Sequence, residues 1–246
     1  MRLDGSNLRV SVAMEFQLHL GARATQLWRV GRSDPWCVRL AVALFVANTL
    51  LLLWPVALVL LETRGLIPNI DRPWAHPGED GSVAEFFNYG QVTLLVVFLF
   101  ALFRHRGPVY LAWAFVYGFV LLDDSLEYHE TVGAFIAANV NLPAVAGQGG
   151  QAVGEILAWA LAGLVFLPII LRALLARGLP KMDGFLFLAC FGTLIFFAVV
   201  IDLVHAMIGG RPLLLIEDGG EMMILAFTAV LALTLWRAHR LGHWDK

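Results

Sequence analysis

Residues 40–61 read LAVALFVANTLLLLWPVALVLL and contain no charged side chain over 22 positions. The hydrocarbon core of a bilayer is about 30 Å thick, and an α-helix needs about 20 apolar residues to cross it. This segment therefore predicts a transmembrane helix. Asp34 and Pro35 precede it, and this pair is typical of the N-cap and first position of a helix.

The rest of the chain repeats this pattern. Hydrophobic residues make up 59% and charged residues 15% of the 246 positions, whereas soluble domains have about 25% charged residues. Five further apolar runs follow the first, and no stretch alternates polar and apolar residues as a half-buried strand does. We therefore predict an all-α, polytopic bundle of six transmembrane helices, over residues 37–61, 82–103, 107–130, 150–172, 183–208 and 213–237.

Two segments flank this transmembrane domain, which we expect to occupy residues 35–240. Residues 1–34 contain Arg, Asp and Glu but no continuous apolar run of the kind found in a signal peptide. Two alternatives remain for them: an amphipathic helix in the membrane interface across residues 8–28, or a plain cytoplasmic tail. Residues 241–246 are predicted to be a short cytoplasmic tail.

The positions of Lys and Arg predict the orientation. If the N-terminus is inside, 14 of the 17 basic residues lie in inside segments, and only Arg64, Arg72 and Arg211 lie outside. The positive-inside rule then predicts that both termini are in the cytoplasm. We expect the protein to lie in a cell membrane, such as the inner membrane of a bacterium. The net charge of −2 and the pI near 6.4 give no reason to expect a nucleic-acid partner.

Acidic residues recur at one depth. The second to sixth apolar runs have only 15–18 residues each, and every one stops at a carboxylate on its outer side. Counted from the first charge at the inner end, these carboxylates lie 16–19 residues along, a helical rise of about 24–30 Å. The pattern predicts an acidic layer near the outer face, made by Glu85, Asp123, Glu155, Asp202 and Glu221.

The spacing within each helix favours metal binding in this layer. Asp202 and His205 are separated by three positions, and Glu217 and Glu221 by four, which are spacings that helical bundles use for metal ligands. Arg211 is the only Lys or Arg expected nearby, so the carboxylates need protons, water or bound cations. We predict a site for one or two divalent metal ions, Fe, Mn or Zn, with the ligands Glu127, Glu155, Asp202, His205, Glu217 and Glu221.

Asp123 is predicted to be a further ligand or the proton acceptor in catalysis. A continuous third helix would place Asp123, Glu127 and Glu130 on one face, at i, i+4 and i+7. His129 would face away from them and would join the site only if the helix ended there. The simpler alternative is a ring of acids that only terminates the helices at the water interface.

These residues favour an integral membrane metalloprotein. As an enzyme it would be a metal-dependent hydrolase or oxidase that acts on a lipid-like molecule from the surrounding membrane lipid. One alternative is a transporter of cations or protons, because carboxylates inside a membrane commonly line such routes. Another is a sensor or assembly subunit without catalytic activity.

Overall fold

The computed structural model describes residues 5–68, 73–75, 81–143 and 150–242, and within them the secondary structure is entirely helical. Helix accounts for 89% of the structure, which confirms the all-α fold class. The elements are α1 (Gly5–Ser33), α2 (Pro35–Thr63), the 3₁₀ turn η1 (Pro73–Ala75), α3 (Val83–Arg106), α4 (Pro108–Ser125), α5 (Tyr128–Asn139), α6 (Gln151–Leu174), α7 (Leu179–Ile195), the π-helix η2 (Phe196–Ile201), α8 (Asp202–Ile208) and α9 (Arg211–Arg240).

Five spans in the described residues are long and apolar enough to cross a membrane: α2, α3, α6, α9 and the stretch from α7 through η2 into α8. A sixth is obtained if α4 and α5 are counted as one span, although the two are bent by 68° relative to each other. The chain is thus a multi-pass membrane protein with five to six spans. The expected continuous helix over 107–130 is wrong, because α4 ends at Ser125 and α5 begins at Tyr128.

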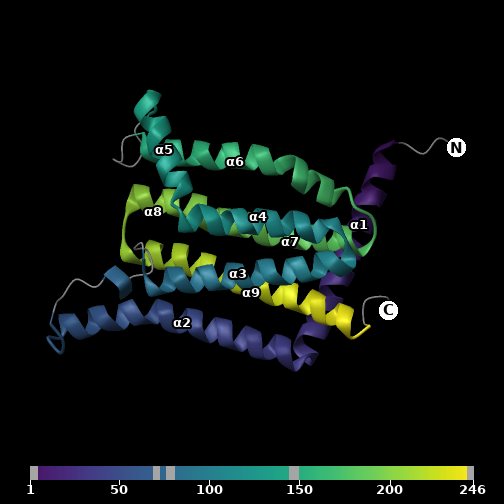
Figure 1. Cartoon of the computed structure of the whole chain (residues 1–246), viewed down its shortest axis with the longest axis horizontal. Helices are drawn as coiled ribbons and strands as arrows, with labels where there is room; N and C mark the ends of the chain where they lie inside the picture. Colours follow the sequence, from purple (N-terminus) through teal and green to yellow (C-terminus); the bar gives the residue numbers. More distant parts are fainter. Residues whose placement is uncertain (1–4, 69–72, 76–80, 144–149, 243–246) are drawn as a thin grey trace.

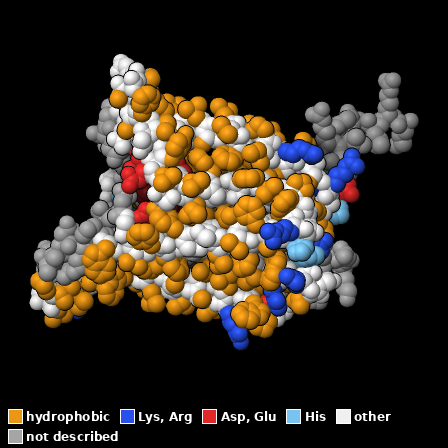
Figure 2. Space-filling model, viewed as in Figure 1, with side chains coloured by type: hydrophobic (Ala, Val, Ile, Leu, Met, Phe, Trp, Pro, Cys, Tyr) orange, Lys and Arg blue, Asp and Glu red, His pale blue; other side chains and the backbone are white. Residues whose placement is uncertain are grey.

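The long helices lie side by side, and α1 crosses them at one end, where α9 also finishes (Figure 1). Residues 5–33 therefore form a helix rather than an irregular tail. We call this end the basic end and the opposite one the acidic end. Figure 2 shows why: apolar side chains cover the length of the bundle, Lys and Arg gather where α1 crosses, and Asp and Glu appear opposite.

Helix α9 occupies the centre of the bundle. In its most apolar 18-residue window 56% of the residues are buried, against 11% in α6, so α6 exposes most of its apolar side chains. Small residues on α9, including Ala226, Ala229 and Ala232, are fully buried and allow neighbouring helices to approach closely. The surrounding core contains Leu95 and Trp113, neither of which is exposed to solvent.

Two ion pairs, the first of them fully buried, attach α1 to the basic end. The Arg23 guanidinium donates to both carboxylate oxygens of Asp183 on α7, at 2.8 and 3.1 Å, and the Tyr110 hydroxyl donates to the same carboxylate at 2.6 Å. The side chains of Arg23 and Asp183 are 2% and 0% exposed. Because both charges are buried, removing either side chain would leave the other charge without a partner inside the protein, which is strongly destabilising.

The second ion pair joins the turn after α1 to the end of α9. Asp34 caps α2 by accepting hydrogen bonds from the N–H groups of Trp36 and Cys37, and its other oxygen accepts from Arg237 at 2.6 and 2.8 Å. Burial alone would raise the pKa of Asp34, but the hydrogen bonds from Arg237 and the two N–H groups outweigh it and hold this pKa below its usual value. The carboxylate is therefore stabilised in its charged form.

Candidate functional site

A cavity of about 830 Å³ lies at the acidic end, among the ends of α3, α4, α5, α6 and α9 and the segment from α7 to α8. Its lining contains two imidazoles, those of His129 and His205, and among the described lining residues there is no Lys or Arg. Nine carboxylates also line it: Glu85, Asp123, Asp124, Glu130, Glu155, Asp202, Glu217, Asp218 and Glu221.

The sequence-predicted residues mostly meet in this cavity. Six of the seven candidates line it, from four different helices: Asp123, Glu155, Asp202, His205, Glu217 and Glu221. Glu127 does not line it, because this residue lies exposed in the turn between α4 and α5. The prediction succeeded because the rise per residue is the same in every α-helix. Carboxylates that lie equally many residues from the inner ends of their helices therefore lie at the same depth.

Asp123 and His129 form a pair on one wall of the cavity. One oxygen of Asp123 accepts a hydrogen bond from the backbone N–H of His129 at 3.0 Å, and the other lies 2.9 Å from its Nδ1. Asp123 thereby caps the start of α5, and only 2% of its side chain is exposed. The His129 ring also packs on Trp159 of α6, with 5.8 Å between ring centroids. The sequence predicted that His129 would join the site only if the third helix ended near it. Helix α4 does end before His129, and His129 lines the cavity.

The turn that creates this pair depends on Glu127. Glu127 has φ of 49° and is the only residue other than glycine with a positive φ in the described part of the chain. A left-handed backbone costs a residue with a side chain about 1–2 kcal/mol, a penalty that glycine avoids. The turn therefore stores strain while it directs α5 across the end of the bundle.

Replacing Glu127 with glycine is expected to stabilise the protein. The relief of strain exceeds the added entropy of the unfolded chain, so the free energy of unfolding should rise by about 0.5–1 kcal/mol. Unfolding by titration with SDS in detergent micelles measures it. Glu127→Ala is the matched control, because it removes the same carboxylate and keeps the strain; an equal gain in this variant would assign the effect to charge.

A second pair in the lining of the cavity is formed by α8 and α9. His205 Nδ1 is 2.9 Å from Oε2 of Glu217 on α9, and the carboxyl group of Asp202 lies close to that of Glu217. The π-helix η2 immediately precedes Asp202 and packs on α9 at Gly220, where a Cβ atom would lie 2.2 Å from the ring of Phe197. The absence of a side chain at Gly220 thus allows this close contact.

Helices α5 and α6 meet through two glycines beside Glu155. A Cβ atom on Gly133 would lie 2.6 Å from the backbone nitrogen of Glu155, and one on Gly154 would lie 2.2 Å from the carbonyl oxygen of Gly133. Glu155 itself accepts a hydrogen bond from Gln151 at 2.9 Å. The close crossing brings the carboxylate of α6 to the cavity wall that carries His129.

Polar groups continue from the cavity into the bundle. Asn88 lines the cavity and accepts a hydrogen bond from Gln91 at 2.9 Å. Gln91 exchanges hydrogen bonds with Asn48 of α2, at 3.1 and 3.3 Å, and Asn48 donates to the Met222 carbonyl oxygen of α9 at 2.9 Å. Asn48 and Gln91 are 0% and 2% exposed, so each amide finds its partners inside the protein.

The carboxylates surround the cavity without converging on one point. Within the described residues, no group of three or more His, Cys, Asp or Glu side chains is placed to hold a metal ion. One oxygen is nevertheless left unsatisfied: Oδ2 of Asp218 is shielded from solvent and has no hydrogen-bond partner. Such a buried oxygen is costly without a proton, water or cation beside it.

The fold and the cavity define a multi-pass α-helical membrane protein with an acidic cavity at one end. Residues 38–235 match the family model described as a domain of unknown function, DUF8692. The match covers more than half of the chain, and the protein belongs to this family. No curated protein and no solved structure matches the chain.

Proposed function

We propose that the acidic cavity binds a divalent cation and that the protein is a membrane-embedded metalloprotein. The observation that carries this proposal is the charge imbalance of the cavity: nine carboxylates face two imidazoles and no Lys or Arg among its described lining residues. Carboxylates in such an apolar surrounding are stable only when they are protonated, hydrated or paired with cations. The unsatisfied Oδ2 of Asp218 supports the same conclusion.

Asp202, His205 and Glu217 are the natural first ligands, because Glu217 contacts His205 and lies beside Asp202. Their oxygen and nitrogen atoms suit Fe, Mn or Zn, and cation binding would draw the three side chains around a common point. Glu155 and Glu221 would complete the ligand set from the adjoining walls. The gathering of Lys and Arg at the other end of the bundle supports an orientation with the cavity near the outer face.

For an enzyme of this kind, the metal ion would activate water or dioxygen against a lipid-like substrate that enters from the membrane. A hydrolase needs Zn or another ion that polarises water, whereas an oxidase needs Fe or Mn. Asp123 holds His129 through Nδ1, so the ring nitrogen Nε2 is the group that can accept a proton. We therefore propose His129 as proton acceptor, with Asp123 orienting it.

The test is metal binding by the purified protein in detergent. Titration calorimetry with Mn²⁺ and Zn²⁺, together with elemental analysis, should detect binding in the parent and a loss of affinity of about tenfold or more in the Glu217→Gln, Glu221→Gln double variant. Glu127→Gln is the matched control, since it removes a carboxylate at the same end but outside the cavity. A parent that binds neither ion, or equal binding in all three proteins, contradicts the proposal.

Transport of a cation or proton is a second candidate, and the polar network of Asn88, Gln91 and Asn48 favours it. These amides extend the polar lining of the cavity into a bundle that is otherwise apolar. A transporter should show ion flux into proteoliposomes that falls when Gln91 is replaced by leucine. Flux that is absent, or unchanged in Gln91→Leu, excludes a route through this network.

A further inference from the structure

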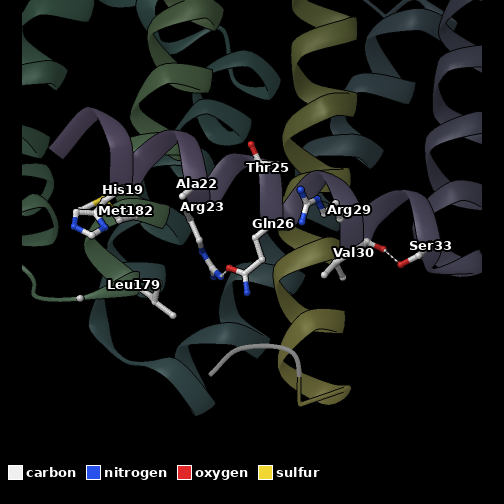
Figure 3. A pocket seen from close by; sticks show the side chains of 11 residues that line it. His19, Ala22, Arg23, Thr25, Gln26, Arg29, Val30, Ser33, Leu179 and Met182 are labelled. Carbon is white, nitrogen blue, oxygen red and sulfur yellow. Dashed lines mark hydrogen bonds between the residues drawn. The ribbon is translucent and has the colours of Figure 1, made fainter. Parts of the chain in front are cut away.

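A second hollow lies at the basic end, between α1 and the start of α7. It has a volume of about 990 Å³ and follows α1 from His19 to Ser33, with Leu179 and Met182 on the α7 side (Figure 3). The 14 residue-to-residue steps from His19 to Ser33 correspond to a helical rise of about 21 Å. We call this elongated hollow the α1 groove; it lies far from the acidic cavity and shares no lining residue with it.

The α1 groove has uncompensated positive charge. Arg29 lines it, is exposed, and has no hydrogen-bond or ion-pair partner in the described part of the chain. Asp and Glu are missing from the described residues that line the groove. The nearby carboxylates of Asp183 and Asp34 are already engaged, by Arg23 and Arg237 respectively. The charge of Arg29 is therefore available to an external anion.

The remaining lining residues are those that an amphiphile contacts. Thr25 and Gln26 also line the groove; the Thr25 hydroxyl donates to the carbonyl oxygen of Gly21, and Gln26 Oε1 accepts from Arg23. Ala22, Val30 and Met182 provide apolar surface in the same groove. A free inorganic anion gains nothing from this apolar surface, whereas a phospholipid places its phosphate on the cation and its glycerol and first acyl carbons on the apolar residues.

We propose that the α1 groove is a binding site for an anionic phospholipid, with Arg29 holding the phosphate. The groove lies where α1 crosses the ends of the spanning helices (Figure 1). Helices that span a bilayer end near the lipid headgroups, so we expect headgroups at this level. The site is independent of cation binding at the acidic end. Its function is to recognise a negatively charged headgroup at the basic end.

The experiment uses the full chain in nanodiscs. Discs of phosphatidylcholine are compared with discs that contain increasing phosphatidylglycerol, and bound lipid is counted by native mass spectrometry. The parent should retain phosphatidylglycerol selectively, and Arg29→Gln should bind it about fivefold more weakly, the effect of one basic residue at a membrane surface. Arg32→Gln is the matched control, because Arg32 is exposed on the same helix but does not line the groove.

The outcomes separate the α1 groove from general surface charge. The proposal is supported if Arg29→Gln binds phosphatidylglycerol more weakly than the parent while the affinity of Arg32→Gln stays within twofold of the parent. Equal weakening in both variants, or equal retention of the two lipids by the parent, overturns it. Inorganic phosphate at millimolar concentration is added in a separate arm; if phosphate alone displaces the lipid, the groove is a site for free phosphate and the lipid proposal is wrong. Thermal unfolding of each variant confirms that it is folded.

Discussion

Replacement of Arg23 by alanine is expected to lower the free energy of unfolding by about 3–5 kcal/mol, the usual cost of leaving one partner of a buried ion pair unpaired. Asp183 would keep only the hydrogen bond from Tyr110, in a position with no solvent exposure. The loss should detach α1 from α7 before the spanning helices separate. SDS titration followed by far-UV circular dichroism measures the loss of the helices. The difference in tryptophan fluorescence with and without Trp28→Phe isolates the signal of α1 among the eight tryptophans.

Two controls test the physical reason for this loss. Arg32→Ala removes an exposed arginine from the same helix and should change stability by no more than about 0.5 kcal/mol. Arg23→Met combined with Asp183→Asn removes both charges, and it should recover much of the loss, because the cost arises from the unpaired charge. If the double variant is as unstable as Arg23→Ala, the loss comes from packing and the argument from charge is wrong.

Gly154→Ala is expected to have the second large effect, a loss of about 3 kcal/mol, at the upper end of the usual cost of overpacking. The added methyl group would lie 2.2 Å from the carbonyl oxygen of Gly133, and a backbone atom cannot rotate away as a side chain can. Helices α5 and α6 must therefore separate, which displaces His129 from Trp159. Binding of a cation in the acidic cavity should weaken with the loss of stability.

Gly163→Ala is the matched control on the same helix. A Cβ atom at Gly163 would have no neighbour within 4 Å, so the substitution should stabilise α6 by up to about 1 kcal/mol through helix propensity. Thermal unfolding in the same detergent compares the two variants. Equal stability of Gly154→Ala and Gly163→Ala would show that α5 does not pack against α6 at this crossing.

The sequence predicted the fold class well because apolar length determines which segments can cross a bilayer. It did not predict the break in the third span. The residues around it, DDSLEYHE at 123–130, contain neither Gly nor Pro, the strongest turn signals, and the Asp-Asp-Ser cluster that opens them is a weaker one. The turn is associated with two contacts of Asp123 with His129 and with a left-handed residue, Glu127, that lacks the usual glycine.

The depth of the candidate site was predictable, whereas the pairing of its side chains was not. Depth follows from the rise per residue, which is nearly the same in every helix. Pairing depends on how each helix is rotated, and that is decided by packing. Spacing suggested that His205 acts with Asp202, but its hydrogen-bonding partner is Glu217, contributed by α9 across the π-helix contact at Gly220. Asp124, Glu130 and Asp218 also line the cavity, although neither depth nor spacing had placed them among the ligands.

The amide contacts of Asn48 imply an order in which the helices assemble during biosynthesis. Asn48 has one partner, Gln91, in the next spanning helix and another, the Met222 carbonyl group, in α9, which is synthesised much later. Helices in a membrane first insert and then associate, and a polar side chain that lacks a partner in lipid favours association. It follows that α2 and α3 can pair early, and that the later arrival of α9 satisfies the remaining amide hydrogen of Asn48.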